Sequence, residues 1–156
     1  MIEIKNIKKT FGERIILEDI SAVMEAGKCN LIIGTSGSGK TVLTKCMVGL
    51  FRPEAGEILY NGTDMLLMNN DERKLLRQQI GMLFQGTALF DSMTVEQNVL
   101  FPLDMFTDWT QAEKKKRANE VLERVNLTDA NKRFPSEISG GMKKRVGIAR
   151  AIVLNP

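Results

Sequence analysis

The chain has 156 residues, of which 43% are apolar and 26% are charged, and its formal net charge is +3. This composition is typical of one globular domain with its own core, and it argues against a disordered chain. Because acids and bases are interspersed and the net charge is small, the overall charge does not indicate a nucleic-acid partner. The N-terminus resembles no signal or transit peptide, and no apolar run approaches the ~20 residues of a membrane helix. Cys29 and Cys46 lack metal or redox spacing and are expected to be buried free thiols in a reducing cytosol.

The first sixty residues carry strand signals. Ile2 and Ile4 alternate with polar residues, and residues 10–13 predict a turn. Residues 15–17 and 20–24 predict two further short strands. Residues 57–60 predict another strand, which the dipeptide Asn61-Gly62 ends in a tight turn.

A phosphate-binding motif follows a further apolar segment. Leu31–Ile33 is short and apolar, which predicts a buried strand, and Leu43, Cys46, Met47 and Leu50 recur at helical spacing. The loop between them fits the pattern G-x-x-x-x-G-K-[ST] in the context that this motif needs, a strand before it and a helix after it. The predicted nucleotide-binding residues of this loop are Gly34, Thr35, Ser36, Gly37, Ser38, Gly39, Lys40 and Thr41.

The chemistry of this loop follows from its residue types. Glycines let the backbone wrap closely around phosphates, and the N–H groups of the first helical turn attract an anion. Lys40 is expected to reach the β- and γ-phosphates as a catalytic cation, and the Thr41 hydroxyl is expected to bind Mg²⁺. The alternative is a glycine-rich turn that only caps a helix, but the surrounding strand and helix favour the phosphate loop.

The second half of the chain is mostly helical. Residues 71–79 predict a polar helix, and Ile80–Phe84 predicts a buried strand that leads to Gln85. Capping boxes at Thr94 and Thr110 open two helices, and Pro102 is expected to end the first of them. The second helix has an apolar stripe formed by Ala118, Val121, Leu122 and Val125.

A basic run, Lys114–Arg117, lies on this second helix. Acidic residues balance it, so it is interpreted as a solvated face, with a phospholipid or nucleic-acid patch as the alternative. A last helix is expected to begin after Ser139, a good N-cap, with one apolar face formed by Met142, Val146, Ala149 and Val153. Its small first residues leave a second candidate phosphate site, made of Ser139, Gly140 and Gly141.

These motifs together resemble the nucleotide-binding subunit of ABC (ATP-binding cassette) transporters. Ser139–Gly141 matches the family signature, and Lys143–Ala151 matches the helix that follows it. Gln85 matches the Q-loop glutamine that touches Mg²⁺ and the attacking water. Phe11 stands where the family places an aromatic ring, usually Tyr, to stack on adenine. The resemblance implies an α/β P-loop NTPase fold of the ABC-cassette type, with an N-terminal antiparallel β subdomain and a helical subdomain.

One branch of the family is more similar than the rest. The signature has Ile138 and Met142 in place of Leu and Gln, and the segments Leu83–Phe90 and Asn98–Leu103 point the same way. These features look like the ATPases of bacterial systems that move phospholipid between membranes with lipid-binding partners of the mammalian-cell-entry type. An importer of a polar nutrient is the alternative, and a soluble ABC ATPase that acts on DNA or ribosomes is a further one.

The resemblance also implies an incomplete domain. The Walker B strand and the switch His of the family have no counterpart here, since the sequence stops just before that strand and contains no histidine. The expected parts are residues 1–86, the β subdomain with the start of the P-loop core, and residues 87–156, the Q-loop and helical subdomain. The chain is thus expected to be one ABC ATPase domain without its C-terminal third, inactive alone, marginally stable and prone to associate.

The family resemblance implies cofactors and partners as well. ATP and Mg²⁺ are expected between two such subunits in a homodimer, with Thr41 and Gln85 near the metal. A transmembrane permease subunit is expected to dock on Thr87–Met93, although core packing would also explain that apolar segment. The expected location is the cytoplasmic face of the bacterial membrane, with no nucleic-acid partner.

Overall fold

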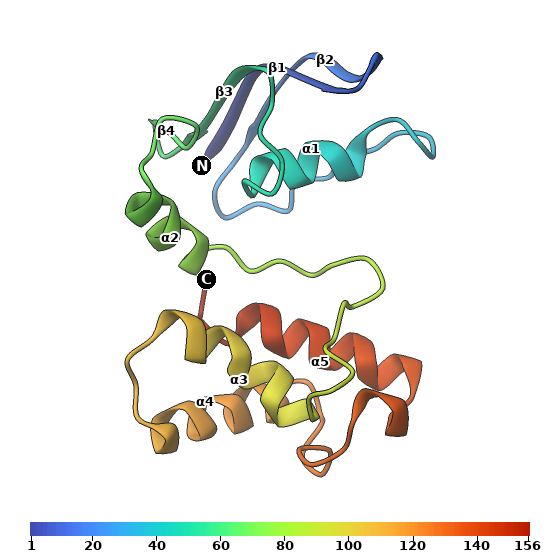
Figure 1. Ribbon diagram of the computed structural model, residues 1–156, viewed down its shortest axis with the longest axis vertical. Helices are drawn as coiled ribbons and strands as arrows, with labels where there is room; N and C mark the ends of the chain where they lie inside the picture. Colours follow the sequence, from blue (N-terminus) through green and yellow to red (C-terminus); the bar gives the residue numbers. More distant parts are fainter. The chain divides into compact units, whose positions relative to one another are not determined.

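The computed structural model describes residues 1–156 and divides them into two compact units, Met1–Leu75 and Leu76–Pro156. The first unit contains a β-sheet and helix α1, and the second contains helices α3, α4 and α5 (Figure 1). Helix α2 (Asn70–Gln78) carries the chain from one to the other. The division into residues 1–86 and 87–156 follows the subdomains of the resembled family and stays a prediction.

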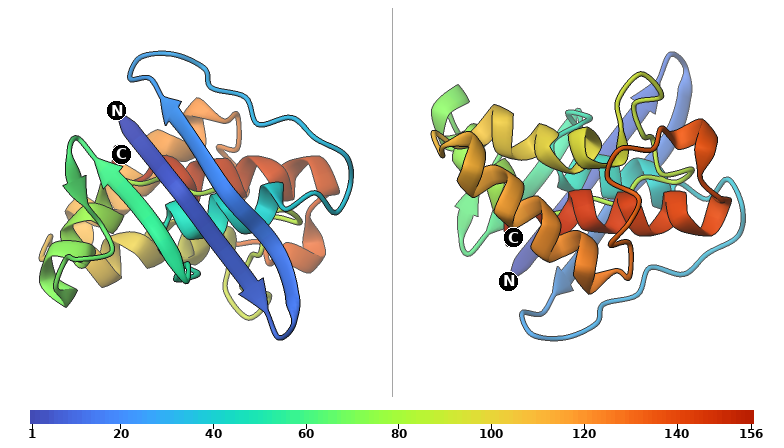
Figure 2. Two further views of the ribbon diagram at one scale, coloured as in Figure 1. Left: turned by 90° about the horizontal axis from the view of Figure 1, so that it is seen from above. Right: turned by 90° about the horizontal axis from the view of Figure 1, so that it is seen from below.

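The sheet of the first unit is antiparallel, with the strand order β2-β1-β3-β4 (Figure 2). Asn61 and Gly62 both have positive φ, 49° and 85°, and they form the predicted tight turn between β3 and β4. The two short strands predicted at residues 15–17 and 20–24 are one continuous strand. The strands are β1 (Ile2–Phe11), β2 (Arg14–Met24), β3 (Ala55–Tyr60) and β4 (Thr63–Asp64).

Helix α1 (Lys40–Met47) covers one face of this sheet. Its Leu43, Cys46 and Met47 are buried, as the helical spacing predicts, whereas Leu50 lies beyond the end of the helix and is 50% exposed, so the prediction is wrong for Leu50. The Tyr60 hydroxyl of β3 donates a hydrogen bond to the Met47 carbonyl at 2.7 Å, and burial raises the pKa of Tyr60 to about 12. Cys29 is exposed, so the prediction of two buried thiols is right for Cys46 and wrong for Cys29, which lies in the irregular stretch before the loop.

Two predicted strands are absent. Leu31–Ile33 and Ile80–Phe84 form no ladder, and Leu31 and Ile33 are 79% and 83% exposed. An extended segment becomes a strand only through hydrogen bonds to a neighbouring strand, and no segment within residues 1–156 pairs with either of these. The strand predictions are therefore wrong for this structure, although both segments stay non-helical.

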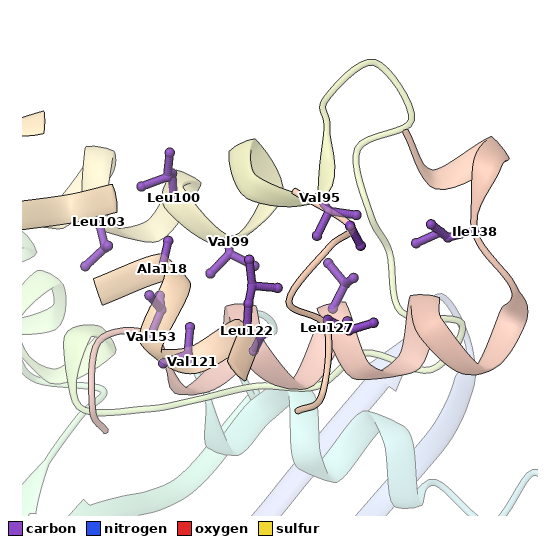
Figure 3. Packing of buried hydrophobic residues seen from close by; sticks show 13 residues of the cluster. Val95, Val99, Leu100, Leu103, Ala118, Val121, Leu122, Leu127, Ile138 and Val153 are labelled. Atoms are coloured by element: carbon purple, nitrogen blue, oxygen red, sulfur yellow. The ribbon is translucent and has the colours of Figure 1, made fainter. Parts of the chain in front are cut away.

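Three helices pack around a common core in the second unit (Figure 3). They are α3 (Val95–Phe106), α4 (Gln111–Arg124) and α5 (Gly140–Ile152), and a short 3₁₀ turn, η1 (Pro135–Glu137), precedes α5. No helix of the chain has both the length and the apolar character needed to cross a membrane. The core is formed by Val95, Val99, Leu100, Leu103, Ala118, Val121, Leu122, Leu127, Ala130, Ile138, Val146, Ala149 and Val153.

The predicted starts of these helices are confirmed, whereas the predicted end of α3 is wrong. Thr94 and Thr110 form complete capping boxes, and the Ser139 hydroxyl accepts from the Met142 N–H, so these predictions are confirmed. Pro102 lies inside α3 and does not end it. Leu103, the next residue, is fully buried in the core, and this packing outweighs the missing hydrogen bond at Pro102.

The basic run on α4 is only partly a solvated face. Lys115 and Lys116 are exposed, as predicted. Lys114 is 7% exposed and its ammonium lies 3.0 Å from an Asp104 carboxylate oxygen. Arg117 donates hydrogen bonds to the carbonyls of Ile152 and Val153 at the end of α5. The prediction is wrong for these two side chains because they lie on the side of α4 that meets the other helices.

Asn98 is the one fully buried polar residue of this core. Its side chain amide accepts from the Phe90 N–H at 2.8 Å and donates to the carbonyls of Phe90, Met93 and Thr94 at 3.0–3.1 Å. All of its partners lie in the loop that leads into α3. Asn98 therefore fixes the conformation of residues 90–94.

We predict that Asn98→Ala lowers the free energy of unfolding of the second unit by about 2–4 kcal/mol, because each buried group left without a partner costs about 1–3 kcal/mol. Trp109, the only tryptophan, lies in this unit and reports its unfolding by fluorescence in urea. Asn119→Ala is the control, since Asn119 is exposed and accepts one hydrogen bond from Asn131. Equal, small effects of both substitutions would contradict the role given to Asn98.

Candidate nucleotide-binding site

The predicted phosphate loop lies between β2 and α1, and a glycine forms the start of the helix. Gly39 is the N-cap of α1 with φ 92°, a left-handed conformation that residues with a Cβ resist. A Cβ there would lie 2.8 Å from the Leu17 Cδ2 and 3.0 Å from the Ile16 carbonyl oxygen. Gly39 therefore lets the loop pass directly against β2 before α1 begins.

Lys40 points back into the loop. Its ammonium donates hydrogen bonds to the carbonyls of Gly34 and Thr35 at 2.8 and 2.7 Å. An ammonium group has three N–H donors, so one remains for a ligand oxygen. The two carbonyls hold the charge at the centre of the loop, where the sequence analysis expects the phosphates.

The first N–H groups of α1 have no acceptor within the chain. The first intrahelical bond of this helix runs from the Leu43 N–H to the Gly39 carbonyl at 2.8 Å. The N–H groups of Lys40, Thr41 and Val42 precede it, and no side chain caps them. Such a helix start, with its positive dipole end, favours an anion. The Thr41 hydroxyl is also exposed and makes no hydrogen bond inside the chain.

A cavity of about 260 Å³ opens at this helix start. Arg14 contributes to its wall, although no motif in the sequence points to this residue. Arg14 is paired with Phe11 across the β1–β2 hairpin, so only the register of the sheet reveals that it reaches the loop. The lining residues are Arg14, Ile16, Gly37, Ser38, Gly39, Lys40, Thr41 and Val42.

Phe11, the predicted adenine-stacking residue, ends β1 and is 46% exposed. Phe51 meets its ring edge-on, with 5.3 Å between centroids, and the Lys9 ammonium lies 5.2 Å from its centroid. Lys9 also bonds to a Glu54 carboxylate oxygen at 2.5 Å, and this hydrogen bond holds the pKa of Glu54 below its usual value. The ring is thus supported from within the chain while part of it stays accessible to a ligand.

The remaining predicted site residues belong to the second unit. Ser139 caps α5, and a Cβ at Gly140 would meet nothing within 4 Å, so this helix start is open. Gln85 is exposed in a turn whose next residue, Gly86, has φ 81°. Arg14 and the residues of the phosphate loop belong to the same unit. The two predicted Mg²⁺ ligands, Thr41 and Gln85, belong to different units.

The fold and the loop define a P-loop nucleotide-binding protein. Within that class, the chain belongs to the ABC transporter family, whose sequence profile matches residues 17–156. This match confirms the family that the motifs indicate.

Curated relatives support the assignment. The chain is 44% identical over 155 residues to a protein of Mycobacterium leprae (strain TN) named "Probable ribonucleotide transport ATP-binding protein mkl". It is 42% identical over 156 residues to the "Methionine import ATP-binding protein MetN" of Rhizobium johnstonii. These alignments cover 99% and 100% of the chain but 45% and 43% of the relatives, so the chain spans less than half of their length.

Solved structures show the same fold. The chain matches the ATP-binding cassette MJ0796, solved as a dimer in a post-hydrolysis state bound to ADP and Pi, with a TM-score of 0.90 and 32% identity. The match covers 100% of this chain and 71% of that one. A second match, described as the ATP-binding subunit of an ABC transporter, has a TM-score of 0.81 and 28% identity and covers 63% of that chain. The structure is therefore a partial ABC cassette.

ABC ATPase domains use ATP with Mg²⁺, and the loop fits both. A Cβ at Gly34 would lie 2.6 Å from the Ser38 hydroxyl, so a larger residue there would require the Ser38 side chain to move. The free N–H groups and the Lys40 ammonium suit phosphate oxygens. Mg²⁺ needs few protein ligands when phosphates and water complete its shell, so the Thr41 hydroxyl is a sufficient first contact. The metal would neutralise phosphate charge there.

We predict that Lys40→Ala weakens the binding of ATP–Mg²⁺ by the chain roughly 10- to 150-fold, since a charged hydrogen bond is worth about 1.5–3 kcal/mol. Isothermal titration calorimetry measures this change, with circular dichroism to verify the fold. The control is Lys28→Ala, which removes one exposed positive charge from the same unit. Unchanged affinity in Lys40→Ala, or an equal loss in both variants, would show that the loop assignment is wrong.

Proposed function

We propose that this chain is the nucleotide-binding part of an ABC transporter ATPase, which couples ATP binding and hydrolysis to transport across or between membranes. The observation that carries the proposal is the open start of α1, where the Lys40 ammonium and uncapped N–H groups face one cavity. The proposed location is the cytoplasmic face of the bacterial membrane, beside a permease subunit.

Two such subunits would share two ATP molecules in a homodimer. In this arrangement Lys40 and Thr41 of one subunit hold the phosphates and the metal, and Gln85 contacts the metal and the attacking water. Ser139, Gly140 and Gly141 of the other subunit contact the γ-phosphate from the opposite side. The open helix start at Gly140 supports this role, because nothing in the chain fills the space in front of it.

We predict that Ser139→Arg abolishes ATP hydrolysis by the protein at its natural length while ATP still binds to the single subunit. The reason is that the signature acts across the dimer, where a bulky cation would occupy the place of the γ-phosphate. Turnover assays and calorimetry on the same sample separate the two effects. Equal loss of binding would place Ser139 in the nucleotide site of its own subunit.

The loop around Phe90 is the proposed docking surface for the permease. Phe90 is 40% exposed, packs on Phe101 with 4.8 Å between ring centroids, and borders an apolar hollow of about 400 Å³. The buried Asn98 side chain bonds to both the N–H and the carbonyl of Phe90, so this surface is preformed in the absence of a partner. Most residues that line the hollow are apolar, which favours a short helix with an apolar face as the docking element of the permease.

We predict that Phe90→Ala, in the protein at its natural length, removes co-purification with a membrane protein and leaves ATP binding within about twofold, since the aromatic anchors of an interface carry most of its binding energy. Trp109→Ala is the control, because Trp109 is a comparably exposed aromatic residue of the same unit. If Phe90→Ala retains the association, or if both variants lose it, the permease does not dock specifically at Phe90.

The proposed cargo is phospholipid, moved with a lipid-binding partner of the mammalian-cell-entry type. The signature residues Ile138 and Met142 support this branch of the family. A polar-nutrient importer is the second candidate, because relatives carry the names of ribonucleotide transport and methionine import proteins.

Gene deletion distinguishes the two cargoes. Under the phospholipid proposal, deletion changes the phospholipid composition of the two bacterial membranes, and the natural gene restores it whereas the Lys40→Ala gene does not. Loss of uptake of one polar nutrient, with unchanged lipids, would favour the importer. If neither changes, the transport proposal itself fails.

A further inference from the structure

The loop after Gln85 has an unusual backbone. Gly86, Thr87 and Ala88 have successive positive φ values of 81°, 67° and 46°. Glycine adopts this region freely, but alanine does so seldom, and a β-branched threonine is a clear outlier. Such a conformation persists only where surrounding contacts hold it, and it is concentrated at functional sites.

Arg150 supplies those contacts from α5. Its guanidinium donates one hydrogen bond to the Ala88 carbonyl at 2.9 Å and another to the Thr87 carbonyl at 2.7 Å. The guanidinium of an arginine holds its donors in a fixed planar fork, whereas the single ammonium of a lysine lies on a flexible stem and does not reproduce that geometry. The guanidinium also lies 5.7 Å from the centroid of the Phe90 ring and is half-buried there.

The same side of α5 contacts the chain on both flanks of Gln85. A Cβ at Gly147 would lie 2.9 Å from the Leu83 Cδ1 and 3.5 Å from the Thr87 Cβ. A Cβ at Gly81 would lie 2.5 Å from the Ala151 carbonyl oxygen. Gln85 itself is exposed between these anchored flanks, so its position is set by α5 and not by its own contacts.

We propose that Arg150 is a positioning residue that fixes Gln85 relative to the signature residues at the other end of α5. The helix starts after Ser139 and reaches Arg150 about 16 Å further on, at ~1.5 Å per residue. A displacement of Ser139–Gly141 therefore moves the Gln85 loop with it. The inference rests on the proposed roles of Gln85 and Ser139, and it adds the connection between them.

The test compares two arginines of one helix. Arg145, like Arg150, donates to two successive carbonyls, those of Val125 at 3.4 Å and Asn126 at 3.1 Å, but these lie after α4 and far along the chain from Gln85. Arg150→Lys and Arg145→Lys thus make the same chemical change at the loop and away from it. Gly147→Ala disturbs the loop from a second side without removing a charge.

The first measurement needs no enzymatic activity. Amide hydrogen exchange of the chain is expected to rise at least about tenfold in residues 85–90 for Arg150→Lys and Gly147→Ala, since loss of anchoring contacts opens a segment locally. Arg145→Lys is expected to leave that segment unchanged. Exchange in residues 85–90 that does not respond to Arg150→Lys, or that responds equally to Arg145→Lys, would overturn the proposal.

The second measurement uses ATP hydrolysis by the protein at its natural length. Arg150→Lys is expected to lower kcat about tenfold or more and to raise the Mg²⁺ concentration for half-maximal activity, because a small misplacement of a reacting group costs up to about 10²-fold. The KM for ATP stays within about twofold, since the phosphate loop is untouched. If kcat falls only in proportion to the fraction of folded protein, Arg150 has a structural role alone and the proposal is wrong. Absence of hydrolysis in the natural protein would refute the proposed function, while hydrogen exchange would still decide on Arg150.

Discussion

The contact between Gly39 and β2 is the constraint on which the nucleotide site depends. Gly39 leaves no room for a Cβ beside Ile16 and Leu17, and its left-handed conformation turns the chain so that α1 starts at Lys40. The ammonium of Lys40 can then fold into the loop, and the first N–H groups of α1 open toward the cavity. A side chain at position 39 would separate the loop from the sheet and remove this arrangement.

The second unit uses long side chains on helices to hold backbone that has no regular partner. Arg117, Arg145 and Arg150 each bond to carbonyls of two successive residues, and Asn98 does the same work for the loop before α3. These contacts satisfy polar groups that would otherwise destabilise the unit. They also hold the irregular segment of residues 85–94 in place, through Arg150 at its start and Asn98 at its end.

The local signals for helix starts predicted the structure correctly, whereas features that depend on a distant part of the chain were predicted wrongly or not found. The capping boxes at Thr94 and Thr110 involve residues three apart, so the sequence contains all of the interaction. The segments Leu31–Ile33 and Ile80–Phe84 are as apolar as strands, but strand formation requires a neighbour that residues 1–156 do not provide. Arg14 was not found for the same reason, because only the pairing with Phe11 brings it to the loop.

The nature of the phosphate loop is tested most directly by the amide NMR signals of residues 34–42. If the loop binds phosphates, ATP–Mg²⁺ and inorganic triphosphate shift the signals of Gly37, Gly39, Lys40 and Thr41, whereas adenosine leaves them in place. If adenosine shifts these signals and triphosphate does not, the loop is not a phosphate site and the account of the molecule is wrong.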